Sequence, residues 1–138
     1  MALKAIPGSW SGAVKSLEYA ISKGAKVSSN SYGGQSSFGG FKNVLDNNPQ
    51  HIFIVAAGNK NTKITSDWQY MPCATQSANN LCVGSSDSSN SRSGFSNYGT
   101  DYVHVMAPGS SIAAPYYRSK TDYAYLSGTR YHYTYLDE

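Results

Sequence analysis

The stretch Ile52-Phe53-Ile54-Val55-Ala56-Ala57-Gly58-Asn59 decides the predicted fold. Its first six residues are all apolar and do not alternate with polar ones. This pattern is typical of a strand in a parallel sheet whose two faces are both covered by helices. We therefore expect a central strand over residues 52–57 with both faces buried, and the polar Asn59 just past its carboxyl end.

Two helices are predicted before this strand. Residues 9–23 carry apolar side chains at helical spacing, and Gly24 follows as a natural C-terminal stop. Residues 37–47 show the same spacing, although two glycines weaken the first turn. The sequence Asn47-Asn48-Pro49 then ends this second helix.

Further strands are predicted at residues 25–31, 81–84 and 102–107, the last of them stopped by Pro108-Gly109. Residues 60–80 are expected to form a long polar loop. The alternation of helices and strands favours an α/β layered fold, and 138 residues are enough for one domain with a single core.

The composition excludes several classes of protein. Hydrophobic residues make up 40% of the chain and charged residues 14%, which is a globular balance and not a disordered one. The net charge is +3 without a cluster of Lys and Arg, so we expect no nucleic-acid partner. No apolar run approaches the roughly 20 residues that span a membrane, and the N-terminus lacks the apolar core of a signal peptide.

The two cysteines, Cys73 and Cys82, are close in sequence. They are too few for a structural zinc site, which needs four ligands, so no metal site is expected. A local disulfide fits an oxidising compartment, and two free thiols in the core fit a reducing one. The sequence leaves both interpretations open.

Six segments, in order along the chain, resemble motifs of the subtilisin-like serine proteases. They are 24–34 (GAKVSSNSYGG), 55–59 (VAAGN), 83–87 (VGSSD), 95–99 (FSNYG), 105–112 (VMAPGSSI) and 125–129 (YLSGT). Their common order carries the resemblance, because each motif alone is short. It implies a three-layer α/β fold with a mostly parallel central sheet, present only as an internal portion. Residues 1–129 would form a partial peptidase domain, and residues 130–138 a tail unlike the family.

The resemblance implies that the Asn59 side chain donates to the oxyanion of the reaction, at the carboxyl end of a strand where open α/β sheets place their sites. The alternative is that Asn59 merely adopts a left-handed turn after Gly58. The resemblance also implies a cis bond between Met71 and Pro72, in a tight turn near the substrate pocket.

The run Ala56-Ala57-Gly58 would form a wall of the pocket for the residue before the cut, and small side chains would keep that pocket open. Close packing of a helix on the strand explains the same run. The run Ser31-Tyr32-Gly33 would present a backbone edge to which a substrate adds as an extra strand. Tyr32 would border a subsite, or would be one more surface tyrosine.

The chain departs from the family at the catalytic triad, whose order is Asp, His, Ser. The Asp and His motifs would precede the first helix, and these 138 residues contain neither. His51, His104 and His132 are interpreted as structural or exposed, and Asp87 as part of a loop motif. Arg130 occupies the position expected for the nucleophilic serine, and its side chain has no nucleophilic oxygen.

The resemblance therefore implies a secreted serine endopeptidase acting on peptides or proteins by acyl transfer, whereas this chain alone should be inactive. The alternative is a non-catalytic fragment that binds peptides or an inhibitory propeptide. No cofactor is expected, although calcium is possible in an intact family domain. A translated intron, a pseudogene and a truncated pseudoenzyme all remain compatible with residues 130–138.

Overall fold

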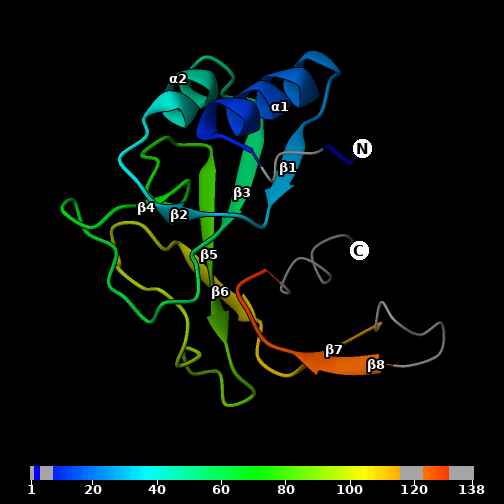
Figure 1. The fold of residues 1–138 in the computed structure, drawn as a ribbon, viewed down its shortest axis with the longest axis vertical. Coiled ribbons are helices and arrows are strands. Elements are labelled where there is room, and N and C mark those ends of the chain that lie inside the picture. Colours follow the sequence, from blue (N-terminus) through cyan, green and yellow to red (C-terminus); the bar gives the residue numbers. More distant parts are fainter. Residues whose placement is uncertain (1, 4–7, 116–122, 131–138) are drawn as a thin grey trace.

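The computed structural model describes residues 2–3, 8–115 and 123–130 (Figure 1). Two helices are present, α1 (Trp10–Ser22) and α2 (Gly40–Asp46). The strands are β1 (Val27–Asn30), β2 (Gly34–Gln35), β3 (Ile52–Ala56), β4 (Tyr70–Met71), β5 (Asn80–Ser86), β6 (Val105–Pro108), β7 (Ile112–Pro115) and β8 (Tyr123–Leu126).

The largest sheet has four strands in the order β1-β3-β5-β6, and every neighbouring pair is parallel. Ile52 of β3 lies beside Val27 of β1, and Phe53 lies beside Asn80 of β5. The predicted parallel sheet is therefore confirmed. β3 lies inside this sheet, between β1 and β5, so the residues directly after β3 lie at the carboxyl edge of the sheet.

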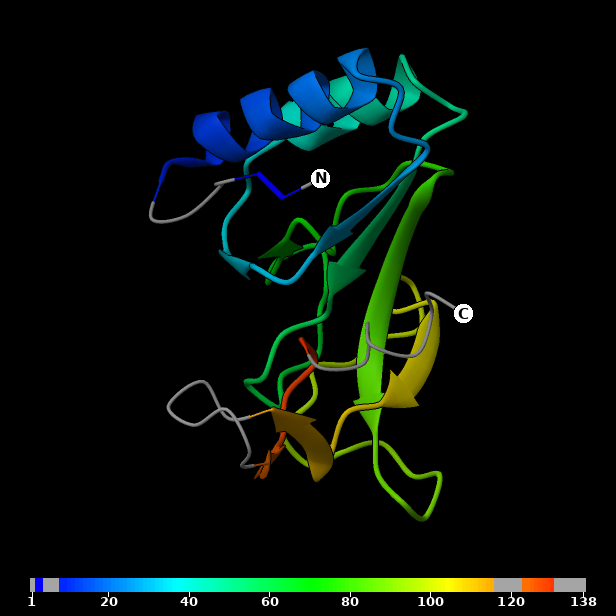
Figure 2. The same cartoon turned by 90° about the vertical axis from the view of Figure 1, so that its right-hand side faces the viewer.

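Both helices cover the same face of this sheet (Figure 2). Phe53 and Val55 point to that face and are fully buried, and the ring of Phe53 stacks on Phe41 of α2 with 5.6 Å between centroids. Ile52 points the other way and is 47% exposed. The expectation that both faces of this strand are buried was wrong at Ile52, whereas Ala56 at the other end of the same face is 5% exposed.

The helix boundaries follow local chemistry. Ser9 caps α1 by accepting a hydrogen bond from the backbone N–H of Gly12. The second helix begins at Gly40 and not at residue 37, and its N-cap, Gly39, has no side chain to cap it. Phe38 therefore lies outside the helix, although its ring still packs against Phe41.

The strands that the sequence missed are short or poor in strand-forming residues. β4 lies inside the predicted 60–80 loop and pairs antiparallel with β2 over two residues. β7 and β8 form an antiparallel pair, and the Ala and Pro content of β7 gave no strand signal. The strand predicted at residues 102–107 was expected to stop before Pro108, but Pro108 is the last residue of β6. Because β6 is an edge strand of its sheet, it tolerates a proline.

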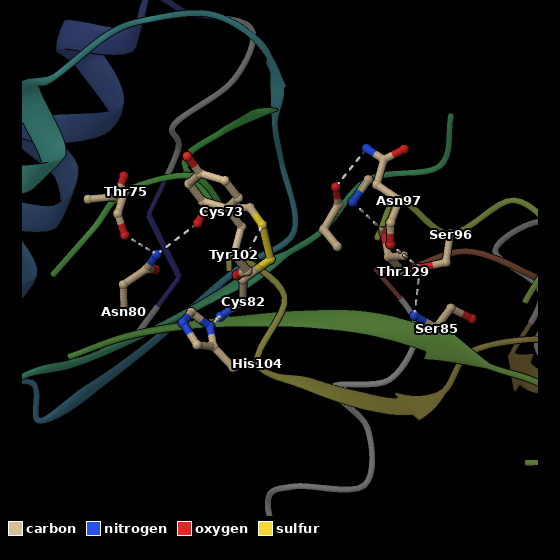
Figure 3. The surroundings of a disulfide bond; sticks show 12 residues. Cys73, Thr75, Asn80, Cys82, Ser85, Ser96, Asn97, Tyr102, His104 and Thr129 are labelled. Carbon is tan, nitrogen blue, oxygen red and sulfur yellow. Dashed lines mark hydrogen bonds between the residues drawn. A yellow bond between two sulfur atoms is a disulfide. The ribbon is translucent and has the colours of Figure 1, made fainter. Parts of the chain in front are cut away.

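Cys73 and Cys82 form a disulfide, with 5.0 Å between their Cα atoms (Figure 3). The bond joins the segment after β4 to the middle of β5. Beside it, the Asn80 side-chain amide donates to the carbonyls of Cys73 and Thr75 at 3.0 and 2.7 Å. The disulfide and Asn80 together fix the loop that enters β5.

Reducing this disulfide should lower the free energy of unfolding by about 2–3 kcal/mol, because the cross-link restricts a short loop in the unfolded chain. Urea denaturation with and without dithiothreitol measures the difference. The double variant Cys73→Ala/Cys82→Ala is the control and should not respond to the reductant. An equal loss in that variant would show that the reductant acts elsewhere.

Candidate functional site

Asn59 follows Ala57 and Gly58 at the carboxyl end of β3, and its side chain is held in one orientation. Its Oδ1 atom accepts hydrogen bonds from the backbone N–H and the Oγ1 hydroxyl of Thr129, both at 2.9 Å. A backbone N–H can only donate, so the atom facing Thr129 must be the oxygen. The Nδ2 group therefore points away from Thr129.

Thr129 is the residue that positions Asn59. It is 1% exposed, and its Oγ1 also accepts from the backbone N–H of Gly58 at 3.2 Å. The sequence analysis placed Thr129 within a motif but gave it no role, because its partners are about 70 residues away along the chain. Its position directly before Arg130 was the available signal.

Asn97 is a second positioning residue that the sequence analysis missed. It is fully buried, and its Nδ2 donates to the carbonyl of Ala57 at 2.8 Å. Its Oδ1 accepts from the backbone N–H groups of Lys60 and Thr62 at 3.0 and 3.2 Å. One side chain thus holds the loop on both sides of Asn59. Its place in the motif 95–99 was the signal in the sequence.

A cavity of about 520 Å³ lies beside Asn59. Among its lining residues are the predicted run 31–33, Ala56, Gly58 and Asn59. Gly8, Ser9, Trp10, Ala13, Tyr70, Thr129 and Arg130 complete the lining. The structure thus brings together the substrate-binding and oxyanion residues suggested by the sequence, except Ala57, which is fully buried in the hydrophobic core.

Two glycines allow the Tyr70 ring to form one wall of this cavity. A Cβ atom on Gly33 would collide with the Tyr70 ring and lie 2.9 Å from the carbonyl oxygen of Met71. Gly58 has a φ of +95°, and a Cβ there would lie 2.5 Å from Tyr70 and 2.6 Å from the side-chain amide of Asn97. Both positions therefore require glycine.

Arg130 gives the cavity its charge. None of the lining residues is Asp or Glu. Burial raises the pKa of Tyr32 to about 12, and burial also raises the pKa of Tyr70, against the opposing effect of the nearby Arg130 cation. Both phenols are therefore neutral hydrogen-bond donors at physiological pH, and the guanidinium of Arg130 is the charged group of the lining.

The described histidines have structural partners. His51 is 1% exposed, with Nε2 at 2.8 Å from the Ser28 hydroxyl and Nδ1 at 2.9 Å from the carbonyl of Ala25. His104 accepts a hydrogen bond from the backbone N–H of Cys82 through Nδ1. His132 lies outside the described residues. Asp87 accepts from two backbone N–H groups of its own loop, as a loop residue should.

No group of three or more His, Cys, Asp or Glu within the described ranges is arranged to hold a metal ion. The site places the Asn59 side-chain amide beside a cavity of about 520 Å³. A side-chain amide held at the carboxyl edge of a parallel sheet can stabilise negative charge on an oxygen by donating a hydrogen bond to it.

The model of the subtilase family matches residues 6–135. The chain belongs to the subtilase family. The match includes part of the 130–138 segment, of which the structure describes only Arg130. The motif-based resemblance is thus confirmed, whereas the proposed boundary at residue 129 stays a prediction.

Among curated relatives, thermitase from Thermoactinomyces vulgaris is 35% identical over 124 residues, which cover 88% of this chain and 41% of thermitase. The subtilisin-like serine protease Rho m 2.0101 from Rhodotorula mucilaginosa is also 35% identical and is covered to 37%. This subtilase chain therefore spans about two fifths of the length of these relatives.

Solved structures give the same assignment. The patellamide maturation protease PatA superimposes with a TM-score of 0.71 at 26% identity, covering 88% of this chain and 44% of PatA. A lanthipeptide protease superimposes with a TM-score of 0.74 at 22% identity, which shows the shared fold. The cis peptide bond predicted from the family resemblance at Met71-Pro72 is present in the structure.

Proposed function

We propose that this subtilase chain supplies the oxyanion donor and part of the substrate cleft of a serine endopeptidase. The observation that carries the proposal is the orientation of Asn59, which lines the cavity and whose Oδ1 is held by Thr129, so that Nδ2 is left to donate elsewhere. The run 31–33 and the small residues Ala56 and Gly58 line the same cavity.

In the proposed reaction a serine hydroxyl gives its proton to a base as its oxygen attacks the carbonyl carbon of the substrate, and the electron pair of the C=O π bond moves onto the carbonyl oxygen. Asn59 Nδ2 donates a hydrogen bond to that oxygen as its negative charge develops. The side chain is already oriented before substrate binds, so no reorganisation is needed in the transition state. The serine, its base and the orienting acid would come from residues other than those described.

The substitution Arg130→Ser alone should not give this chain peptidase activity. A serine nucleophile needs a base to take its proton, and the three triad residues act as a unit. His51 and His104, the described histidines, are engaged with Ser28, Ala25 and Cys82. Incubation of the Arg130→Ser chain with a fluorogenic peptide library should therefore give the same background as the unchanged chain.

Activity should appear only when an Asp- and His-bearing subtilase segment, the Arg130→Ser change and a family-like C-terminal segment are combined. Cleavage by the single variant would mean that a base lies within these 138 residues. The proposal that the base and the acid come from other residues would then be wrong.

The proposed substrates are peptides or proteins, as the family implies, and an inhibitory propeptide is a proposed partner. Secretion is also proposed, and the Cys73–Cys82 disulfide supports it because such bonds persist in oxidising compartments. Of the helices in the described ranges, neither has the length and apolar character to cross a membrane.

A second candidate function is peptide binding without catalysis. The observation that favours it is the cavity itself, which is assembled within this chain and has an arginine at the position expected for the nucleophile. Binding and turnover can be measured separately. A peptide that binds without being cut would support this second function for the chain as it stands.

A further inference from the structure

We propose that Ser28 and His51 form a second nucleophilic site, a serine–histidine pair that accepts an acyl group from esters of short apolar acids. Ser28 lies on β1 and lines a cavity of about 300 Å³ between β1 and α1. The lining of this second cavity includes neither Asn59 nor Arg130. The inference therefore does not depend on the proposed role of Asn59 in a peptidase.

The first argument is the position of the proton on His51. Its Nδ1 lies 2.9 Å from the backbone carbonyl oxygen of Ala25, which can only accept a hydrogen bond. Nδ1 must therefore carry the proton, and Nε2 of the neutral ring is the acceptor. The Ser28 hydroxyl, 2.8 Å from Nε2, then donates its proton to the ring. In this arrangement a histidine can act as the general base toward a serine.

The second argument is that Asn30 fixes the same direction of the Ser28 proton. Its Nδ2 donates to the carbonyl of Ile54 at 3.2 Å and to Ser28 Oγ at 3.1 Å, and its Oδ1 accepts from the Tyr32 hydroxyl at 3.1 Å. The contact with a carbonyl identifies the nitrogen of this amide, because a carbonyl cannot donate. Ser28 Oγ thus accepts from Asn30, and its single proton is directed to His51.

The third argument is the access that a small ester has to Ser28. This serine is half-buried and lines the cavity, whereas His51 is 1% exposed. None of the described lining residues is charged. Most of them are apolar, namely Leu3, Ala13, Leu17, Ala20, Ala25 and Val27. A cavity of this size and lining suits a short apolar acyl chain.

In the proposed step, Ser28 Oγ attacks the carbonyl carbon of the ester as its proton passes to His51 Nε2. A C–O bond to Ser28 forms, and the C–O bond to the leaving alcohol breaks with its electron pair on the leaving oxygen. The proton on Nε2 then passes to that oxygen or to water, so the ring ends neutral. The orienting group is the neutral carbonyl of Ala25 and not a carboxylate, so we expect acylation by esters with good leaving groups and not cleavage of peptide bonds.

The test treats the full 138-residue chain with p-nitrophenyl butyrate. Release of p-nitrophenolate should accompany the transfer of one butyryl group, which mass spectrometry of the digested chain should locate on Ser28. Ser28→Ala should lose this modification, and His51→Gln should slow it by about 10²-fold, the lower end of what a general base contributes. The control is Ser22→Ala, at an exposed serine that ends α1 and lines neither cavity, and it should react like the unchanged chain.

A second comparison leaves the buried His51 in place. In Ser28→Cys the thiol proton can pass to His51, and the thiolate displaces iodide from iodoacetamide. At neutral pH, Ser28→Cys should be alkylated at least about tenfold faster than Ser22→Cys, because a neighbouring base raises the thiolate fraction. Exposure alone predicts the opposite order, since residue 22 is exposed and residue 28 is half-buried.

Two results would overturn the proposal. Butyryl groups found on other residues but not on Ser28 would show that the pair is not nucleophilic. Alkylation of Ser22→Cys at the same rate as Ser28→Cys, or faster, would show that the bond between Ser28 and His51 serves the fold alone. Either result would leave the proposed role of Asn59 standing, because neither Ser28 nor His51 lines the cavity beside it.

Discussion

Replacing Asn59 with alanine in a rebuilt peptidase should lower kcat by about 10²–10³ while KM changes little, a magnitude taken from the side-chain oxyanion donor of subtilisin itself. The rebuilt protein combines this chain with an Asp- and His-bearing segment, Arg130→Ser and a family-like C-terminal segment. The reason is the geometry: the two bonds from Thr129 hold Asn59 Oδ1, and Asn59 lines the cavity, so its Nδ2 is the group left to donate there. A donor to the transition state affects kcat more than substrate binding.

The matched control is Asn43→Ala, which makes the same change on the exposed surface of α2. It should leave kcat and KM at the values of the rebuilt parent. If Asn59→Ala also behaves like the parent, or raises KM with kcat unchanged, then Asn59 is not the oxyanion donor. The alternative that Asn59 adopts a left-handed turn was wrong, because the non-glycine residues with positive φ in the described ranges are Asn61, Asn90 and Ser111.

Replacing Phe53 with alanine should lower the free energy of unfolding by about 3–5 kcal/mol, because it removes a fully buried aromatic ring and leaves a cavity. Phe53 lies on the central strand β3 and stacks on Phe41 of α2, so it joins the sheet to the helical layer. A domain is stable by only about 5–15 kcal/mol, so this loss is a large fraction of the total. Urea denaturation with linear extrapolation measures it.

The neighbouring Ile52→Ala is the matched control, since Ile52 lies on the same strand but points to the opposite face and is 47% exposed. Its cost should stay below about 1 kcal/mol. Equal costs for the two variants would mean that the faces of β3 are assigned wrongly, and that the helices do not lie on the side of Phe53.

Several features were predictable because their signals are local. The apolar run 52–57 indicated a strand inside a parallel sheet, and the apolar spacing in residues 9–23 indicated α1 to within one residue at each end. The position of Asn59 after that strand put it at the carboxyl edge, where open α/β sheets have their sites. The order of the short motifs indicated the family.

Other features have weak or no local signals. β4 consists of two residues, which is too few to show a pattern, and the helix α2 lost its first turn to Gly39 and Gly40. The exposure of Ile52 could not be read from the composition of β3. An apolar residue such as Ile52 looks the same in sequence whether another element covers it or not.

The sequence by itself determined the parallel sheet, the family and the candidate donor Asn59. The tertiary structure decided which way that donor points. Thr129 and Asn97 are about 70 and 40 residues from the loop that they hold, and only the folded chain brings their hydrogen-bonding groups within 3.2 Å of it. Spacing along a chain carries no information about such pairs, because their geometry depends on how separate strands and loops pack together.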